Sequence, residues 1–200
     1  MFSMAVLNAS GAHALTPEEY KYATKCLDNQ SIPHCLALLK SSNSQLREDA
    51  VYGLGKGGIS NKDVLPHIFK VLSHPEPKMR QTAASAFGNV IEPEDSYAKP
   101  AIPKLVKMLS GPTKGERVAA IFALARVGNS ASTKSVIKYI IPFFNSSDEV
   151  LRQASVCDLK FHMSKHSGEA VPYLLPMLKD KNSSIRLCSS EVLRGLGYKI

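Results

Sequence analysis

Five arginines recur at one fixed distance from an apolar residue, and their repetition makes them the first candidates for binding chemistry. They are Arg47, Arg80, Arg117, Arg152 and Arg186, each fifteen positions after Ile32, Leu65, Ile102, Ile137 and Val171 in turn. A guanidinium binds phosphate or carboxylate in a bidentate manner. Each arginine, however, is followed at three and seven positions by a small or apolar residue, which places it beside the apolar stripe of a helix. We therefore expect a structural role, with the stem packed on a neighbouring helix and the guanidinium reaching turn carbonyls.

The four cysteines could supply redox or metal chemistry only if their spacing supported it. They are Cys26, Cys35, Cys157 and Cys188, and no two of them have the Cys-x-x-Cys spacing of a zinc or redox site. The last two occupy positions in successive repeats that differ by about one helical turn, so they could approach each other. Free cysteine is among the most buried residue types. We expect four small buried thiols in reducing surroundings rather than a disulfide framework.

His162 and His166 are the candidate metal ligands, since a spacing of four puts both imidazoles on one face of a helix. The pair lacks the glutamate of a His-Glu-x-x-His site, and no third ligand is nearby. The chain also shows no glycine-rich phosphate loop, paired catalytic acids or nucleophile motif. We expect no metal, no cofactor and no catalytic residue.

The spacing of the five apolar-to-arginine intervals predicts the architecture. Successive starts lie 33, 37, 35 and 34 residues apart, while the interval inside each copy is constant. Stacked supersecondary units show this pattern, because insertions fall in the turns between units. In the third copy, residues 102–109 carry one helical apolar stripe, residues 110–113 break it, and residues 116–125 form an alanine-rich second helix. Each unit is therefore a short first helix (A), a polar turn and a longer second helix (B).

Turn residues and prolines predict where these helices begin. Ser, Asn and Asp side chains in the turns can cap the next helix, and Thr16 before Pro17 starts an N-terminal helix. The prolines after the opening residues are expected in the first turn of their A helices, where an amide has no intrahelical acceptor to lose; they are Pro33, Pro66, Pro103 and Pro172. Pro142 and Pro176 lie deeper and should kink their helices. No stretch alternates as a strand does, so we expect no sheet.

The B helices resemble a known repeat family. Leu46-Arg47-Glu48-Asp49-Ala50 with Leu54-Gly55, and Met79-Arg80-Gln81-Thr82-Ala83 with Phe87-Gly88, are similar to the Val-Arg-x-x-Ala-x-x-Ala-Leu-Gly pattern of short, PBS-lyase-like HEAT repeats. The resemblance covers residues 31 to 197. It implies an all-α fold, a right-handed α-solenoid of about five helix pairs preceded by an N-terminal capping helix. We expect a single domain at 16–200, with the cap helix at 16–28 and repeats at about 29–59, 60–93, 96–129, 132–166 and 167–200.

The resemblance also implies ion pairs between repeats. In the family the arginine often pairs with an acid six residues earlier, and these pairs form a ladder along the stack. Only Asp180, six residues before Arg186, occupies that place here. We therefore do not expect a complete ladder.

The two ends of the chain carry weaker signals. Residues 1–15 are expected to be flexible or weakly signal-like: they end near Ala12-His13-Ala14, but no basic residue precedes Lys21. No apolar run has the length of a membrane span, so we expect a cytoplasmic protein, with export through a weak signal left open. At the other end, no polar capping repeat follows the last B helix. Leu187 and Leu193 should be partly uncovered, and association through this end is an open alternative.

Function is expected on the surface that the stacking creates. In the family the B helices line a concave groove, and counting from each opening residue selects the positions that point into it. The expected partner-binding residues are Tyr52, Gln81, Ser85, Asn89, Phe122, Arg126, Gln153 and Phe161. Aromatic anchors flanked by polar residues suit capture of a peptide or helix from another protein. The alternative that Phe122 and Phe161 belong to the core stays open at this point.

Two other functions remain as alternatives to a non-catalytic scaffold or adaptor. The net charge of +8 favours binding of nucleic acid or an acidic surface, but most lysines fall on the A helices and turns, and the groove positions include acids: Glu48, Asp49, Asp158 and Glu191. We therefore rank nucleic acid below protein as the partner. Some short HEAT proteins resemble bilin lyases, whose activity has no short signature to test. Di-iron hydroxylases of this type use recurring His-Glu dipeptides, and this chain has none.

Overall fold

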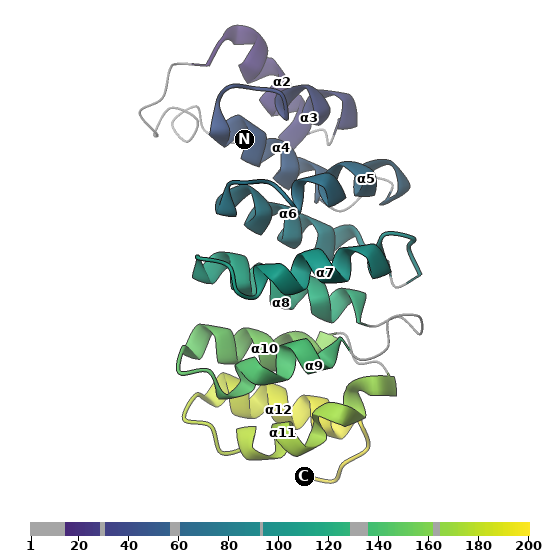
Figure 1. Cartoon of the computed structure of the whole chain (residues 1–200), viewed down its shortest axis with the longest axis vertical. Helices are drawn as coiled ribbons and strands as arrows, with labels where there is room; N and C mark the ends of the chain where they lie inside the picture. Colours follow the sequence, from purple (N-terminus) through teal and green to yellow (C-terminus); the bar gives the residue numbers. More distant parts are fainter. Residues whose placement is uncertain (1–14, 29–30, 57–60, 93, 129–135, 162–164) are drawn as a thin grey trace.

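The computed structural model describes residues 15–28, 31–56, 61–92, 94–128, 136–161 and 165–200, and within them the secondary structure is entirely helical (Figure 1). The helices are α2 (Pro17–Leu27), α3 (Ile32–Leu38), α4 (Ser44–Leu54), α5 (Asn61–Val71), α6 (Pro77–Val90), α7 (Ala98–Met108), α8 (Lys114–Val127), α9 (Ile137–Ile140), α10 (Glu149–Phe161), α11 (Val171–Met177) and α12 (Ser183–Gly195). Two 3₁₀ segments join them, η1 (Ile141–Asn145) and η2 (Lys165–Ala170). Residues 1–14, on which the expectation of a flexible or signal-like segment falls, and His162 lie outside the described residues.

The helices form two layers that run the length of the molecule. The B layer contains α2, α4, α6, α8, α10 and α12, each packed on the next. The A layer contains α3, α5, α7, η1 with α9, and α11, each packed on the B helix that follows it. Figure 1 shows the pairs stacked from one end of the chain to the other. The expected fold class, an all-helical solenoid, is confirmed, while the boundaries proposed for the individual repeats stay predictions.

The core lies between the layers and between successive pairs. Leu54, Phe87, Leu124 and Phe144 are fully buried, as the apolar stripes of their helices require. Small residues let neighbouring B helices approach closely: a methyl group added at Gly55, the C-cap residue that follows α4, would overlap the backbone and Cβ of Ala86 in α6. The solenoid therefore depends on glycine and alanine where B helices meet.

Helix caps form where the turns predicted them. Thr16 and Glu19 make a complete capping box at the start of α2. The side-chain oxygens of Asn43, Thr113 and Asn182 accept hydrogen bonds from backbone amides in the first turns of α4, α8 and α12. The polar turns thus fix the first residue of several B helices.

The prolines of two A helices lie deeper than we expected. Pro33 and Pro172 occupy the first turns of α3 and α11, but Pro66 and Pro103 lie inside α5 and α7, which begin at Asn61 and Ala98. The prediction of a first-turn position is therefore wrong for the second and third copies, because both helices extend by an additional turn on the N-terminal side. Pro142 follows the point where α9 ends and the backbone continues as the 3₁₀ helix η1, in agreement with a break there.

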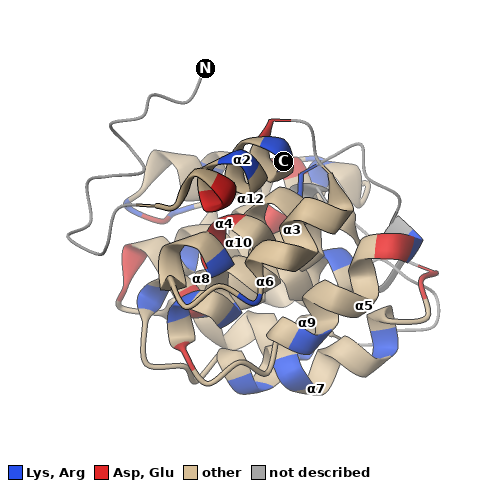
Figure 2. Cartoon of the chain, turned by 90° about the horizontal axis from the view of Figure 1, so that it is seen from above, with Lys and Arg blue, Asp and Glu red and all other residues tan. Residues whose placement is uncertain are grey.

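Lysines gather on the A layer. Helix α7 carries Lys99, Lys104 and Lys107 and no acid, and Lys138 lies on α9 (Figure 2). On the last helix pair, Leu187 is 55 % exposed, as expected, whereas Leu193 is fully buried, contrary to expectation. Leu193 lies on the face of α12 that packs into the stack.

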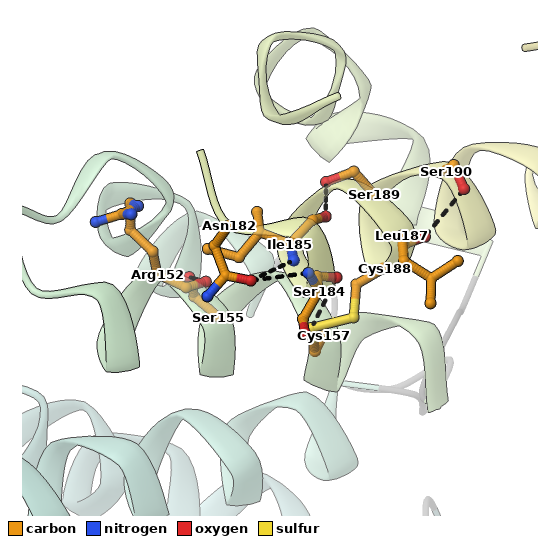
Figure 3. The surroundings of a disulfide bond; sticks show 10 residues. All are labelled: Arg152, Ser155, Cys157, Asn182, Ser184, Ile185, Leu187, Cys188, Ser189 and Ser190. Carbon is orange, nitrogen blue, oxygen red and sulfur yellow. Dashed lines mark hydrogen bonds between the residues drawn. A yellow bond between two sulfur atoms is a disulfide. The ribbon is translucent and has the colours of Figure 1, made fainter. Parts of the chain in front are cut away.

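Disulfides join both pairs of cysteines, so the expectation of four reduced thiols is wrong. Cys26 of α2 is bonded to Cys35 of α3, with Cα atoms 4.8 Å apart. Cys157 of α10 is bonded to Cys188 of α12, with Cα atoms 5.0 Å apart (Figure 3). The first bond fixes the N-terminal helix to the first pair, and the second fixes the fourth B helix to the fifth. Neither pairing has a sequence signature of its own, because each depends on how two helices pack.

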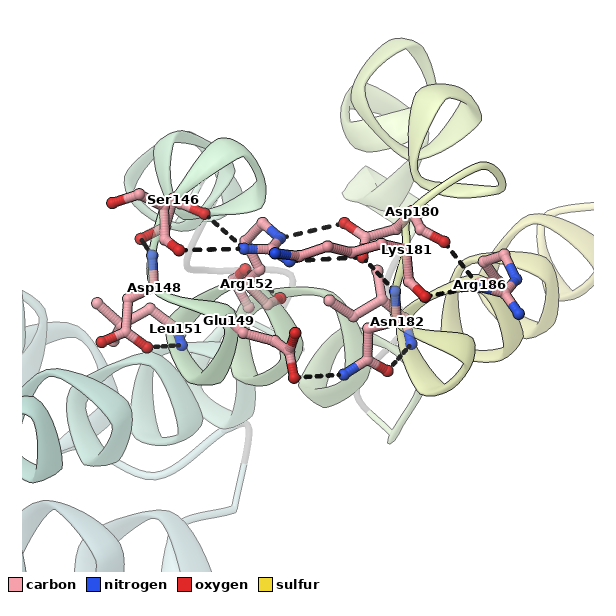
Figure 4. A network of polar contacts seen from close by, with 12 residues as sticks. Ser146, Asp148, Glu149, Leu151, Arg152, Asp180, Lys181, Asn182 and Arg186 are labelled. Carbon is pink, nitrogen blue, oxygen red and sulfur yellow. Dashed lines mark hydrogen bonds and ion pairs between the residues drawn. The ribbon is translucent and has the colours of Figure 1, made fainter.

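All five repeated arginines hold their own turns, as expected. Each donates through its Nη1 to backbone carbonyls five or six residues earlier: Arg47 to Ser41 and Ser42, Arg80 to His74 and Pro75, Arg117 to Gly111, Arg152 to Ser146 and Ser147, and Arg186 to Asp180 and Lys181. Figure 4 shows the last two turns with the contacts between them. These charge-assisted bonds satisfy carbonyls at the end of each A helix.

Ion pairs between repeats are more numerous than the sequence suggested. Arg47 pairs with Glu76 at 3.1 Å, Arg80 with Glu116 at 2.6 Å and Arg152 with Asp180 at 3.1 Å. Asp180 is thus a partner of the preceding repeat's arginine, and the other two acids lie four residues and one residue before their own repeat's arginine. The acids come from three different positions, and among the described residues no ion pair joins Arg117 to the next repeat, so the ladder is incomplete, as expected.

We expect the disulfides to contribute to stability. Removing Cys157–Cys188 by the double substitution Cys157→Ala/Cys188→Ala should lower the free energy of unfolding by about 2 to 4 kcal/mol, because the bond closes a 31-residue loop. Urea unfolding without reductant measures it, and the same variant compared with wild type in reductant is the control. Thiol titration of the unfolded, unreduced protein should find no free thiol; four free thiols would contradict the disulfides.

Gly55→Ala should destabilise the stack by about 1 to 3 kcal/mol, because the added methyl group overlaps Ala86 of the neighbouring B helix. Gly168→Ala is the control, since nothing lies within 4 Å of a methyl group there. Thermal or urea unfolding of both variants measures the difference. Equal stabilities would show that α4 and α6 do not approach this closely.

Candidate functional site

A hollow of about 480 Å³ lies on the face formed by the middle helices of the B layer. We call it the B-helix trough. Its walls come from α6, α8 and α10, and its lining residues are Gln81, Ser85, Lys114, Gly115, Val118, Ala119, Phe122, Val150, Ala154 and Asp158. Three of the eight expected partner-binding residues therefore meet in one hollow: Gln81, Ser85 and Phe122.

Phe122 both lines the trough and packs between repeats. Its side chain is partly buried. A methyl group added at Gly88 of α6 would overlap the Phe122 ring, so the ring lies directly on that backbone. The core interpretation and the groove interpretation thus both apply: one part of the ring supports the stack, and the trough exposes another.

Gln81 forms the opposite edge of the trough with Ser85. Its amide lies against Gly115 of α8, where a side chain would leave no room for it. Both residues belong to α6 and are partly buried. They provide amide and hydroxyl groups beside the apolar wall of Val118 and Ala119, an arrangement suited to hydrogen bonding with an extended backbone.

Two cations on this layer, the expected partner-binding residue Arg126 and Lys56, donate hydrogen bonds to helix ends. Arg126 Nε donates to the carbonyl oxygen of Gly88 near the end of α6, at 2.8 Å. Lys56 Nζ donates to the carbonyl oxygen of Leu27 at the end of α2, at 2.6 Å. Each cation therefore caps the C-terminus of the preceding B helix, where the helix dipole is negative. The role predicted for Arg126, to bind backbone or acidic groups of a partner, remains untested.

The remaining expected residues lie on the same layer but outside the trough lining. Tyr52 is 53 % exposed on α4, with Lys56 Nζ 5.8 Å from its ring centroid. Asn89 and Gln153 are exposed on α6 and α10. Phe161 is the last residue of α10, and its side chain lies outside the described residues. All eight assignments as partner-binding residues stay predictions.

Asp158 is the acid of the trough lining; the sequence had placed it among the acids at the groove positions but had not selected it as a partner-binding residue. It is a partly buried residue of α10, and burial raises the pKa of its carboxyl to about 6. Burial is the cause because it disfavours the charged form, and no hydrogen bond or ion pair from a described residue opposes it. The sequence did hold a signal: an acid occupies a position where the other repeats have Gly53, Ala86, Ala123 and Val192.

Other charges near the B-helix trough are paired. Lys114, at the N-terminal end of α8, forms an ion pair with Asp148 at 2.8 Å. On α4, burial also raises the pKa of Asp49, while a hydrogen bond donated by Gln45 Nε2 at 2.9 Å opposes the rise. Asp158 thus differs from both carboxylates, because they have partners within the protein.

A second hollow, of about 630 Å³, lies along the turns between the second and third pairs. Arg80, Lys104 and Lys107 give it a basic lining. Arg80, however, is held by Glu116, which is only 1 % exposed, and Lys104 Nζ donates to the Ser73 hydroxyl and lies 4.6 Å from the Phe69 ring centroid. Two of the three basic side chains of this hollow, Arg80 and Lys104, are therefore engaged in contacts with the neighbouring repeat.

No group of three or more His, Cys, Asp or Glu side chains within the described residues is arranged to hold a metal ion. Among the described helices, none combines the length and the apolar character that crossing a membrane requires.

Asp158→Asn should stabilise the protein at neutral pH. The raised pKa means that the folded state binds this proton more tightly than the unfolded state, so the contribution to stability is present near pH 4 and is lost as the pH rises through about 6. At pH 7.5 the variant should exceed wild type by about 1 to 3 kcal/mol, and at pH 4 the two should agree. Urea unfolding at both pH values measures this.

Asp63→Asn is the matched control, because Asp63 is exposed on the outer helix α5 and its substitution removes the same charge. A gain at pH 7.5 that is equal for both variants would attribute the effect to net charge, and no gain would contradict the burial of Asp158.

Known proteins with a similar sequence or fold are repeat proteins or engineered proteins. The family model described as HEAT repeats matches residues 32–101. Comparison with curated proteins gives no match. An engineered protein of known structure superposes with a TM-score of 0.66 at 16 % identity, covering 90 % of this chain and 88 % of its own.

Two further solved structures are natural or designed repeat proteins. A designed armadillo repeat protein, YIII(Dq.V1)4CPAF, in complex with peptide (KR)4, superposes with a TM-score of 0.64 at 14 % identity, covering 88 % of this chain and 89 % of its own. An archaeal HEAT-like repeats protein from Thermococcus onnurineus NA1 gives 0.57 at 17 % identity, covering 94 % and 84 %. The match over residues 32–101 and the stacked helix pairs agree with the resemblance: this part of the chain is similar to HEAT repeats, and the fold of the described residues is an all-helical solenoid.

Proposed function

We propose that the protein is a non-catalytic scaffold or adaptor that binds a segment of another protein along the B layer. The observation that carries this proposal is the B-helix trough, in which apolar walls meet polar edges. Val118, Ala119 and Phe122 supply apolar surface from α8, and Ala154 continues it on α10. Gln81 and Ser85 on α6 supply hydrogen-bonding groups beside it.

This combination fits a peptide better than a small metabolite. The lining of the trough comes from helices of three successive pairs, and its polar groups lie on all three of these helices. Binding of an extended segment uses backbone hydrogen bonds for affinity and side-chain pockets for specificity. Tyr52, more than half exposed on α4, extends the same face toward the N-terminus and is a candidate anchor.

The similar structures support the class of function. One is a designed armadillo repeat protein in complex with peptide (KR)4, and another is a structure of computationally designed armadillo repeat proteins for modular peptide recognition. At 12 to 14 % identity this likeness carries the fold alone, so peptide binding comes to this chain by analogy. The trough is the independent support.

The basic A layer supports a second candidate function, binding of nucleic acid or another acidic surface. Lys99, Lys104 and Lys107 lie on α7 without an acid on that helix. Binding of this kind depends on neutralising phosphates, so its affinity falls steeply as salt is added. A peptide anchored in the trough by apolar contacts should depend on salt far less.

Association through the last helix pair is a further part of the proposal. Tyr173 and Leu175 on α11 and Leu187 on α12 are between 43 and 55 % exposed. Exposed apolar side chains grouped on one part of a surface favour contact with another protein.

Tyr52→Ala should weaken peptide binding by about 2 kcal/mol, close to thirtyfold, because an exposed aromatic anchor loses its contact area. The probe is the strongest binder selected from a random library of displayed 12-residue peptides, measured by fluorescence anisotropy. Tyr173→Ala is the matched control, since Tyr173 is 46 % exposed on the A layer.

Equal affinities of the two tyrosine variants would contradict binding along the B layer. Selection of no peptide, together with salt-sensitive binding of a DNA oligonucleotide that Lys99→Glu/Lys107→Glu abolishes, would replace the proposal with the A-layer function.

A further inference from the structure

Asp158, one of the residues that line the B-helix trough, breaks the pattern of the repeats. In the other four copies the same position holds Gly53, Ala86, Ala123 or Val192, and all four are buried where B helices pack. The fourth copy alone places a carboxyl there. A departure of one repeat from a position that packing keeps small or apolar indicates a role other than packing.

The carboxylate of Asp158 has no partner among the described residues. No hydrogen bond or ion pair reaches it, although it is the side chain by which α10 contributes charge to the trough. Partly buried carboxylates normally accept hydrogen bonds or pair with cations, because burying a charge without compensation is costly. Among the described residues that compensation is missing.

The charged groups on the neighbouring elements do not fill the role. On α8, Lys114 pairs with Asp148; on α10 itself, Glu149 accepts a hydrogen bond from Asn182, and Arg152 pairs with Asp180. Helix α12 carries Arg186, Glu191 and Arg194, of which Arg186 donates to turn carbonyls, and η1 carries no charged residue. None of these groups contributes to the pKa of Asp158.

The walls beside Asp158 are apolar. Val118 and Phe122 belong to α8, and Ala154 lies one turn before Asp158 on α10. The carboxylate therefore shares the lining of the trough with apolar side chains. Lysine and arginine have the complementary form: an aliphatic stem that packs on apolar surface and a cationic end group. An arginine in particular can donate two parallel hydrogen bonds to one carboxylate.

We propose that the B-helix trough is a specificity pocket for a lysine or arginine side chain of the bound protein segment, with Asp158 as the residue that accepts its cationic group. The proposal rests on the proposed function and names the chemistry of its ligand. The stem lies against Val118, Phe122 and Ala154, while Gln81 and Ser85 on the facing edge bond the backbone of the segment.

The inference explains why a basic protein would bind a basic segment. Most lysines lie on the A layer and in the turns, and the cations Lys56 and Arg126 donate to the carbonyls of helix ends. Among the described residues the carboxylate of the trough therefore has no cationic partner, since the trough's own cation, Lys114, is bound to Asp148. Charge complementarity is local to the trough and opposite to the net charge.

The test is fluorescence anisotropy with a labelled eight-residue peptide of alternating lysine and arginine, compared with an alternating glutamine–serine peptide of the same length. Wild type should bind the cationic peptide at pH 7.5 and physiological salt and should bind the neutral peptide at least tenfold more weakly. Asp158→Asn should reduce affinity for the cationic peptide at least tenfold and leave the neutral peptide unchanged. Asp63→Asn, which removes one exposed acid from α5, should change neither by more than about twofold.

A pH series separates the carboxylate from general electrostatics. Wild-type affinity for the cationic peptide should increase from pH 5 to pH 7.5 as Asp158 ionises, and the affinity of Asp158→Asn should not. Equal losses in Asp158→Asn and Asp63→Asn, or equal affinities of wild type for the two peptides, would overturn the inference.

The proposed function has its own outcome. Library-selected peptides that lack lysine and arginine, bind with sensitivity to Tyr52→Ala and ignore Asp158→Asn would retain peptide binding and remove the cation pocket. Absence of any selected peptide would remove both.

Discussion

The solenoid depends on the hydrogen bonds that the recurring arginine of each helix pair donates to turn carbonyls. Its guanidinium closes the turn between the A and B helices of its own repeat, and in three repeats it also binds an acid of the next one. The same group therefore sets the geometry inside a unit and the spacing between units. Glu116 shows the consequence: it is almost fully buried, which is tolerable because Arg80 binds it through two nitrogens. The regular stacking of α6, α8 and α10 determines the shape of the trough.

The sequence predicted the architecture well because the architecture is periodic. A constant fifteen-residue interval determined the helix pairs, and polar turns determined several caps. Features that depend on the packing of one helix on another escaped it. The disulfides need Cys157 and Cys188 to face each other across α10 and α12, and the ladder acids come from three different offsets. Disulfides persist in oxidising compartments, so they count against the cytoplasmic location, which stays a prediction.

The candidate site was predictable only where it follows the repeat. Counting along the B helices selected Gln81, Ser85 and Phe122, which meet in the trough. The same count selected Arg126, because the repeat period predicts only the direction in which a side chain points. It does not predict that the Arg126 side chain donates a hydrogen bond to the carbonyl oxygen of Gly88, near the end of the preceding B helix. Asp158 was recognised as an acid at a groove position but was not selected as a binding residue, because its partial burial without a partner among the described residues depends on how α10 packs.

Positions that are alike in every copy and the single exceptional position have different roles in the molecule. Arginine, glycine and alanine at equivalent places in every copy hold the stack, and their loss would be felt as instability. A carboxylate at one packing position does the reverse: without a partner it opposes folding at neutral pH. Such a residue persists in a marginally stable protein only if something outside the fold compensates it, and a cation in the trough would supply that compensation when bound. The same charge would then lower stability in the free protein and supply affinity in the complex, so ligand binding and stability at neutral pH are linked through a single side chain.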